Sequence, residues 1–288
     1  IAQTDKLAYS SANITLNTNS LGTFVLSSAE GGQGIGGYDD NMPRAWEEVW
    51  DTGIATNANF QKGVGSSTNI SWTTPKVAGT SIQLAYAPDN DGAQNNNKNV
   101  SGSTSDAFGQ GWDLVIDTGT ADGAINLFVG GSRTELAKTK TDRDLSGDHE
   151  EAVVGLQFKF GPVALGGQVS AERLRTRAVN TAEYYGNSSW GIAFNVNDSL
   201  SVSYSEARHL MTKTHKASRS QGVVGLKGET NLNEYTPKSW MRGDSIQVAY
   251  TIGGVGLKYA RTTYDNTLFT FDDKVPREAQ IVAISLAF

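Results

Sequence analysis

Hydrophobic and polar residues alternate one by one along most of this chain. In the stretch AVVGLQFKF, Val154, Leu156 and Phe158 fall on one side, while glycine, glutamine and lysine fall on the other. The same period recurs in residues 244–252 and 255–260. A period of two predicts β-strands, and no stretch shows the period of 3.6 that is typical of a helix. We therefore expect an all-β fold.

The alternating stretches predict about thirteen strands, each roughly as long as a tilted membrane-spanning strand needs to be. The expected strands cover residues 12–18, 22–28, 68–74, 80–87, 111–118, 124–132, 150–160, 163–174, 188–196, 200–208, 244–252, 255–263 and 279–288.

Short and long connections between these strands take turns. The short ones include NSL, PKVAG, GTADG and NDS, and the long ones cover roughly residues 29–67, 88–107, 134–149, 175–187, 209–243 and 265–278. A soluble sandwich has no reason to place all its long loops at one end. Outer-membrane barrels do so regularly, with tight turns on the periplasmic side and long loops outside.

The composition supports a barrel over a sandwich. Only 38% of the residues are hydrophobic, which is little for the dry core of a large sandwich. A barrel that faces lipid outside and water inside needs no such core. A net charge of −6 gives no electrostatic footprint for nucleic-acid binding, and the absence of cysteine excludes thiolate metal sites and disulfides.

Two motifs resemble those of Gram-negative outer-membrane barrels. The chain ends QIVAISLAF, and its terminal Phe288 is similar to the aromatic residue that forms part of the assembly signal in those proteins. The segment ITLNTNSLGTFVLSS, followed by a glycine-rich acidic stretch, resembles the general bacterial porins. In that family a long third loop folds into the barrel and narrows it. The resemblance therefore implies that residues 29–67 form a constriction loop.

The resemblance also implies a fold and an assembly. We expect a single transmembrane antiparallel β-barrel domain over residues 1–288, of the 16-stranded porin type, embedded in a lipid bilayer with lipopolysaccharide and assembled as a homotrimer. Thirteen visible strands then imply that the first three strands are missing from this sequence. The alternative is a fourteen-stranded barrel in which residues 1–11 or 217–230 supply a further strand.

Charged residues in the predicted loop and on the wall are the candidate site. The expected constriction residues are Asp39, Asp40, Arg44, Glu47, Glu48 and Asp51. The expected basic residues of the lumen wall are Lys159, Lys258, Arg173, Arg175 and Arg208, with Arg261 nearer the rim. Opposed charges across a pore set up a transverse field. The alternative is that residues 29–67 form a solvated external loop.

A second acidic segment resembles part of a calcium-binding loop. In DRDLSGDHE, Asp142, Asp144 and Asp148 fall at alternate positions, with a glycine at the expected sharp turn. A possible calcium site is therefore expected there, and a solvated acidic loop is the alternative. We expect no other cofactor.

These observations predict an outer-membrane general diffusion porin that passes small hydrophilic solutes and ions, with a mild cation preference from its acidic loop. The histidines, His149, His209 and His215, are expected in external loops, and no serine–histidine–acid order is compelling, so we expect no enzyme. Two alternatives are an outer-membrane barrel enzyme of the lipase or protease type and a soluble β-rich adhesin or carbohydrate-binding protein.

Overall fold

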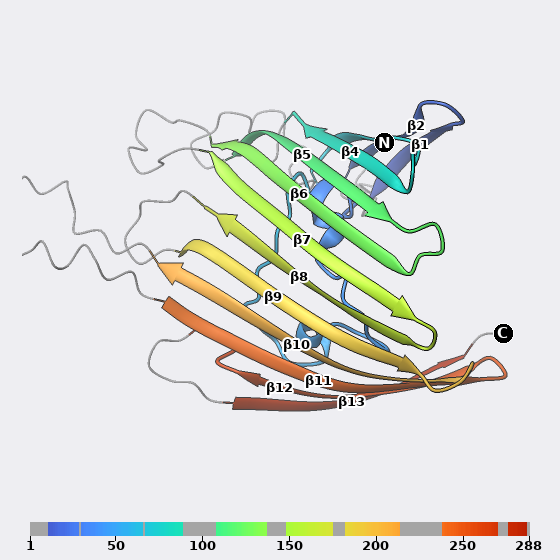
Figure 1. Cartoon of the computed structure of the whole chain (residues 1–288). Coiled ribbons are helices and arrows are strands. Elements are labelled where there is room, and N and C mark those ends of the chain that lie inside the picture. The colour runs from blue at the N-terminus through green and yellow to red at the C-terminus, as the bar shows by residue number, and fades with distance from the viewer. Residues whose placement is uncertain are drawn as a thin grey trace, which may run out of the picture.

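The protein forms one antiparallel sheet of 13 strands, each paired with its neighbours in chain order (Figure 1). The structure is a computed structural model that describes residues 11–28, 30–65, 67–88, 108–136, 148–174, 182–213, 238–269 and 276–286. The predicted all-β fold and the predicted strand order are confirmed. Arg175, Asp142, Asp144, His215 and Phe288 lie outside the described residues.

The strands lie close to the predicted ranges. They are β1 (Ala12–Thr18), β2 (Gly22–Ser28), β3 (Asn69–Thr73), β4 (Thr80–Ala87), β5 (Phe108–Gly119), β6 (Ile125–Leu136), β7 (His149–Phe160), β8 (Val163–Arg173), β9 (Ala182–Asn195), β10 (Leu200–Lys213), β11 (Lys238–Ile252), β12 (Val255–Asp265) and β13 (Pro276–Leu286). Two short 3₁₀ helices, η1 (Gly34–Tyr38) and η2 (Val49–Asp51), lie in the long connection between β2 and β3. No helix in the described part is long and apolar enough to cross a membrane.

The tight turns gather at one end of the sheet, on the right in Figure 1. Two residues separate β7 from β8 and two separate β11 from β12, and the pairing of Ile252 with Val255 closes the latter hairpin. At the edges, β1 pairs with β2 and β13 pairs with β12, and neither has a second partner among the described residues. The expectation of sixteen strands stays a prediction. Of the segments expected to supply an alternative fourteenth strand, residues 1–10 and 217–230 lie outside the described part.

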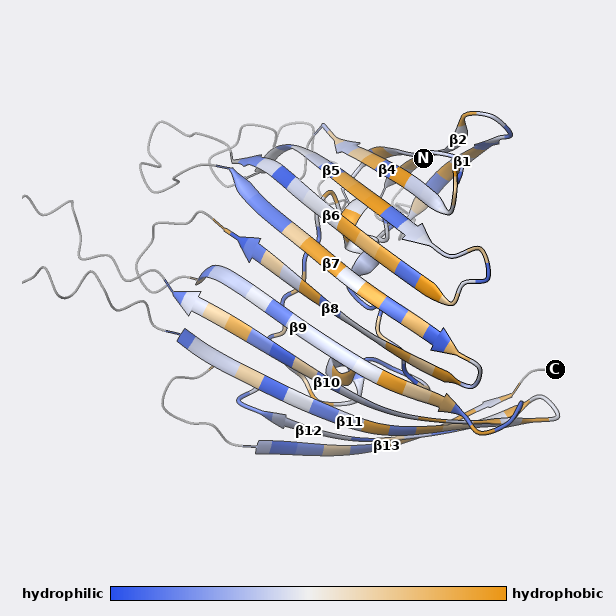
Figure 2. Ribbon diagram, viewed as in Figure 1, coloured by the Kyte–Doolittle hydropathy of each residue, from blue (hydrophilic) through white to orange (hydrophobic). Residues whose placement is uncertain are grey.

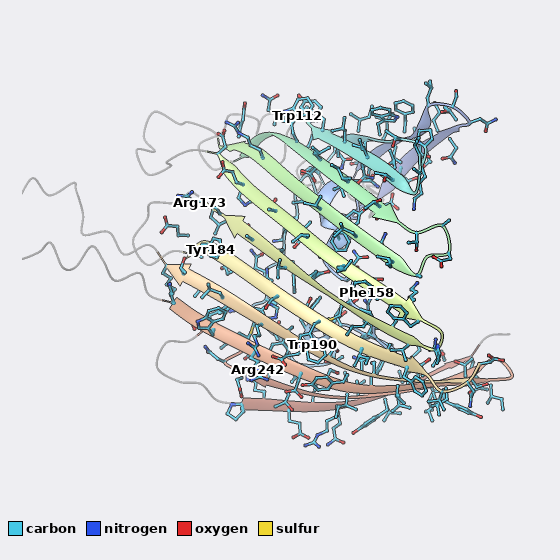
Figure 3. All side chains as sticks on the ribbon, viewed as in Figure 1. Trp112, Phe158, Arg173, Tyr184, Trp190 and Arg242 are labelled. Atoms are coloured by element: carbon cyan, nitrogen blue, oxygen red, sulfur yellow. The ribbon has the colours of Figure 1, made fainter. Side chains whose placement is uncertain are left out.

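The two faces of the sheet differ in chemistry. The outer face carries exposed hydrophobic side chains, and Trp112 and Ile246 are 55% and 52% exposed (Figure 3). The inner face carries small and polar side chains, and Ser245 and Gln247 on β11 are fully buried. Hydrophobic and hydrophilic positions alternate along the strands (Figure 2). This is the distribution that a strand needs when one side meets hydrocarbon and the other meets water.

The buried apolar clusters lie where the connection between β2 and β3 packs on the inner face. Ile35 joins Val115, Phe128 and Val153 of β5, β6 and β7. A larger cluster contains Met42, Val49, Ile54, Ala207, Met211, Met241, Tyr264 and Phe269. These clusters are small and local, so the described residues form no continuous core between two sheets. The sheet is held by its hydrogen-bond ladders and by the segment packed against its inner face.

Candidate functional site

Residues 30–65 cross the inner face of the curved sheet, where Figure 1 shows η1 and η2 on the inner side of the strands. We call this segment the inner loop. It leaves the wall near β5, reaches β11 and β12, and returns to β5. At its far end the backbone N–H of Ala45 donates to Ser203 on β10 (2.9 Å), and the hydroxyls of Thr52 and Thr262 on β12 are bonded. The loop therefore contacts most of the strands on its way.

Two glutamines of the wall hold the outward leg of the inner loop, the part that runs from β5 to β11 and β12. The side chain of Gln168 accepts from the N–H of Asn41 (3.0 Å) and donates to the carbonyl of Asp39 (2.6 Å). Gln247 does the same at the far end, since it accepts from the N–H groups of Trp46 and Glu47 and donates to the carbonyl of Glu47 (2.6 Å). An amide side chain carries both a donor and an acceptor, so it can pair with loop backbone as a strand would.

Two carboxylates of the wall hold the return leg of the inner loop, the part that runs back to β5. Glu151 on β7 accepts from the N–H groups of Lys62 (2.8 Å) and Gly63 (2.7 Å). Asp113 on β5 accepts from the N–H of Val64 (3.1 Å) and also from that of Ile35 (3.0 Å), where the outward leg begins. Hydrogen bonds to charged acceptors contribute roughly 1.5–3 kcal/mol each. Asp113 thus closes the inner loop by binding both of its ends.

Glycine is required on both sides of this carboxylate. Gly34 and Gly63 have φ angles of +61° and +56°, a region that side chains with a Cβ rarely adopt. A methyl group at either position would also overlap the carboxylate of Asp113. Gly34, one of the glycines that mark residues 31–37 in the sequence as a sharply turning segment, therefore has a partner on the wall that the sequence did not reveal.

Aromatic and imidazole rings fill the space between the return leg and β10. His209 bonds to Asn187 (2.8 Å) and to the hydroxyl of Tyr264 (3.0 Å), and its ring meets Phe60 edge-on. Asn187 in turn donates to the carbonyl of Asn59 in the inner loop (2.7 Å). His209 was expected in an external loop, and this expectation is wrong. The strand β10 extends beyond its predicted end, which brings His209 onto the inner wall.

The acidic residues of the inner loop surround its one arginine. Arg44 pairs with Asp40 (3.1 Å) and with Glu48, which lie four residues before and after it in sequence. Burial, reinforced by the neighbouring Asp40, raises the pKa of Asp39 above its ordinary value, and burial raises the pKa of Glu48 as well. The loop carries six carboxylates against one guanidinium and one ammonium, Arg44 and Lys62; the carboxylates are those of Glu30, Asp39, Asp40, Glu47, Glu48 and Asp51. The structure brings Asp40, Arg44 and Glu48 together as one bonded group.

The predicted basic residues of the lumen wall divide between the two faces. Lys258 belongs to the inner face, where its ammonium lies 5.8 Å from the ring centroid of Trp46 in the loop. Lys159 lies at an inner-facing position of β7, close to the tight turn after that strand.

Three arginines lie on the outer face, which corrects the expectation that they line or rim the lumen. Arg208 alternates with the buried inner residues Ala207 and His209, and its Nε donates to Glu206 (2.7 Å). Arg173 follows the inner residue Glu172, and Arg261 pairs with Glu278 on β13 (2.8 Å). Figure 3 labels Arg173 with other side chains of the outer face. A shift by one residue moves a side chain to the opposite face, and the sequence did not resolve the inner register near these strand ends.

The described residues also place the remaining candidates. Asp148, expected as a calcium ligand, pairs with Arg133 (2.5 Å). His149, expected in an external loop, begins β7 and lies buried on the inner face, where it contacts Glu172 (3.0 Å). The wall residues that hold the loop, among them Asp113, Glu151, Gln168 and Gln247, were not predicted. The sequence feature that could have identified them is a large polar residue at an inner position of a strand.

The sequence model of the Gram-negative porin family matches residues 9–234, well over half of the chain. The chain belongs to the Gram-negative porin family. The protein is therefore located in the bacterial outer membrane. The alternative of a soluble adhesin or carbohydrate-binding protein is therefore wrong. No curated protein resembles the chain closely enough in sequence to count as a match.

Several solved structures share the porin's fold. An anion-selective porin from Comamonas acidovorans superimposes with a TM-score of 0.58 at 12% identity, covering 95% of this chain and 77% of that one. A loop-L8 deletion form of OmpT, an outer-membrane protein of Vibrio cholerae, gives 0.56 at 10% identity, covering 96% and 78%. A further solved porin gives 0.53 at 10% identity, covering 94% and 90%. At these identities the likeness extends to the fold alone.

Proposed function

We propose that this porin is a general diffusion channel whose inner loop, residues 30–65, narrows a water-filled passage for small hydrophilic solutes and ions. The observation that supports it is the fixation of the loop on the inner face by wall side chains from β5 to β12. A loop held on one side by Gln168 and Gln247 and on the other by Asp113 and Glu151 keeps its shape as solute passes. Transport through it is passive.

The charges of the loop support a mild preference for cations. Arg44 is neutralised within the loop by Asp40 and Glu48, so it adds little positive potential to the passage. The other loop carboxylates have no such partner on the loop, and Lys258 supplies an opposing charge at the inner wall. The Comamonas porin is described as anion-selective. At 12% identity that property belongs to that protein and says nothing of the charges here.

Planar-bilayer recording tests this proposal. Purified protein should form open channels, and a salt gradient should give a reversal potential on the cation side. The double variant Asp39→Asn/Asp40→Asn should move the reversal potential toward zero, because two loop charges are removed. Asp122→Asn, in the exposed turn between β5 and β6, is the matched control and should leave it unchanged. Absence of channels, or an anion preference, would refute the proposal.

We propose a homotrimer in contact with lipid and lipopolysaccharide, with no covalent chemistry of its own. The family and the exposed outer face support membrane contact. Of the two described histidines, His209 is bonded to Asn187 and Tyr264 within the packed wall, and His149 contacts Glu172. Cross-linking in detergent should give a trimer band, and ester and peptide hydrolysis should stay at background. A possible calcium site at Asp142, Asp144 and Asp148 stays a prediction, which calcium titration of the purified protein would test.

A further inference from the structure

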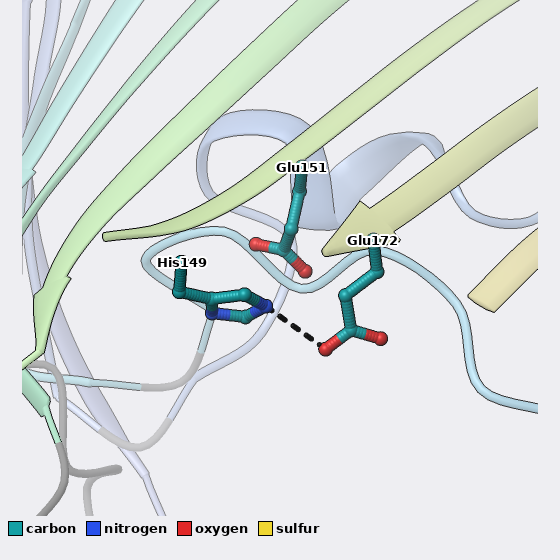
Figure 4. A group of neighbouring side chains, drawn as sticks. All are labelled: His149, Glu151 and Glu172. Carbon is teal, nitrogen blue, oxygen red and sulfur yellow. Dashed lines mark hydrogen bonds and ion pairs between the residues drawn. The ribbon is translucent and has the colours of Figure 1, made fainter. Parts of the chain in front are cut away.

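Three side chains that can bind metal meet beneath the return leg of the inner loop (Figure 4). His149 and Glu151 come from β7 and Glu172 comes from the adjacent strand β8, and all three are buried. One ligand atom from each residue lies within 4.8 Å of the others. His149 Nε2 and Glu172 Oε1 are 3.0 Å apart. Glu151 also helps to hold the inner loop, and none of the three is among the loop charges proposed to set the ion preference.

We propose that His149, Glu151 and Glu172 form a binding site for a divalent transition-metal ion, of which Zn²⁺ is the best match. One imidazole and two carboxylates are a donor set that Zn²⁺ accepts, with ligand distances of about 2.0–2.2 Å. Two atoms bound to one ion at such distances lie roughly 3 Å apart. His149 Nε2 and Glu172 Oε1 already have this separation, and the ligand atoms of all three residues lie within 4.8 Å of one another.

Neighbouring groups of the loop orient the two carboxylates. Glu151 is held by the N–H groups of Lys62 and Gly63, and Glu172 accepts from the side-chain amide of Asn59. Hydrogen bonds of this kind fix the orientation of ligands in metal sites and tune their affinity. A carboxylate oxygen that accepts one such bond keeps a lone pair for an ion. The loop bonds are therefore compatible with metal binding and favour it.

A buried amide in the same loop segment is a second, independent sign. Gln61 is 2% exposed, and neither side-chain atom has a hydrogen-bond partner among the described residues. Buried polar groups are normally paired. Gln61 directly precedes Lys62, whose N–H holds Glu151, and an amide oxygen is a ligand type that divalent cations accept. The segment that covers the cluster thus carries one more oxygen donor than the loop bonds use.

Charge and proton balance follow from the same geometry. A divalent ion neutralises the two carboxylates, and it competes with the nearby cation Lys62, which acts electrostatically on His149. Binding through Nε2 needs the unprotonated nitrogen, so a proton on Nε2 moves to Nδ1 or leaves to solvent. The bound ion would tie the segment around Asn59 and Gly63 to the wall more firmly than hydrogen bonds alone.

Metal titration of the full chain tests the proposal. Detergent-purified protein, treated with EDTA and dialysed, is titrated with Zn²⁺ by calorimetry and with Co²⁺ by visible absorption. We expect one saturable equivalent, and at least tenfold weaker binding in His149→Ala and in Glu172→Gln. Glu206→Gln, which removes a carboxylate on the outer face, is the matched control and should bind as the unaltered protein does.

The proposal is overturned by the absence of saturable Zn²⁺ or Co²⁺ binding, by equal binding in folded His149→Ala, or by binding of Ca²⁺ alone. Heat-modifiable migration on a gel checks that each variant is folded. Where His149→Ala and Glu172→Gln fail that check, Lys62→Gln decides, because loss of the competing positive charge should tighten Zn²⁺ binding several-fold. Unchanged or weaker binding in folded Lys62→Gln overturns the proposal. The test does not depend on transport, so it can fail while channel activity stands.

Discussion

The N–H of Val64 lies 3.1 Å from Oδ2 of Asp113, and this contact closes the inner loop where it returns to the wall. The same oxygen accepts from Ile35, where the loop sets out (3.0 Å). One buried carboxylate on β5 therefore fixes both ends of a segment whose middle reaches β12. The geometry makes the position of the whole loop depend on a few wall side chains.

Asp113→Ala should loosen the loop and destabilise the protein. The substitution leaves the N–H groups of Ile35 and Val64 buried without an acceptor, which costs roughly 1–3 kcal/mol for each group. Unfolding by denaturant in detergent should show the loss in free energy, and single-channel records should show larger current fluctuations. Asp122→Ala, in an exposed turn, is the control. Equal stability of the two variants would contradict the role of Asp113.

Gly63→Ala should be more damaging than Gly123→Ala. Both glycines have a positive φ, +56° and +70°, so both substitutions carry a conformational cost of about 1–2 kcal/mol. A methyl group at Gly63 also overlaps Asp113, whereas at Gly123 it meets nothing within 4 Å. The difference between the two free energies of unfolding isolates the clash. Equal losses in the free energy of unfolding would show that the loop accommodates the methyl group at residue 63 without an energetic cost.

Lys258→Gln should strengthen the cation preference. The ammonium of Lys258 lies on the inner face beside Trp46 of the loop, so its removal takes a positive charge from the passage. Arg261→Gln removes the same charge from the outer face, where Arg261 pairs with Glu278. Reversal potentials in a salt gradient should move only for Lys258→Gln. Equal shifts in both variants would mean that the assignment of the two faces is wrong.

Cation preference should weaken as the pH falls, and earlier than ordinary carboxyl groups would allow. Burial raises the pKa of Asp39 above 3.8 and that of Glu48 above 4.5, so both groups take up protons at higher pH than free side chains do. Reversal potentials measured between pH 7 and pH 4 should fall toward zero. Asp39→Asn should reduce the change, and a pH-independent potential would exclude these groups from selectivity.

The same shifts set the sign of the stability change. Because the folded state holds these two protons more firmly than the unfolded state does, their contribution to stability decreases as the pH rises through the window above 3.8 and 4.5. The substitution Asp39→Asn removes the ionisable group. It should therefore flatten the dependence of the free energy of unfolding on pH in this window, which denaturant titrations at several pH values would measure.

Much of the fold was predictable because a strand has a period of two. That period located the strands, assigned Val154 to the outer face, and showed that short and long connections alternate. Near the strand ends it failed. The strands β9 and β10 extend past their predicted limits, so His209 lies on a wall where loop was expected. The pairing between neighbouring strands continues there although the hydrophobic alternation does not.

By itself the sequence determined the strands, their order and the chemistry of the two faces, since these follow from local alternation and from turn length. Only the tertiary structure decided which inner residues meet water and which hold the loop. Gln247 binds Glu47 across 200 residues of chain. An inward glutamine that faces water and one that pairs with loop backbone look alike in sequence, because both satisfy the same donor and acceptor. Whether such a glutamine pairs with water or with the loop depends on the path of the loop, and that path depends on all the wall contacts of the loop together.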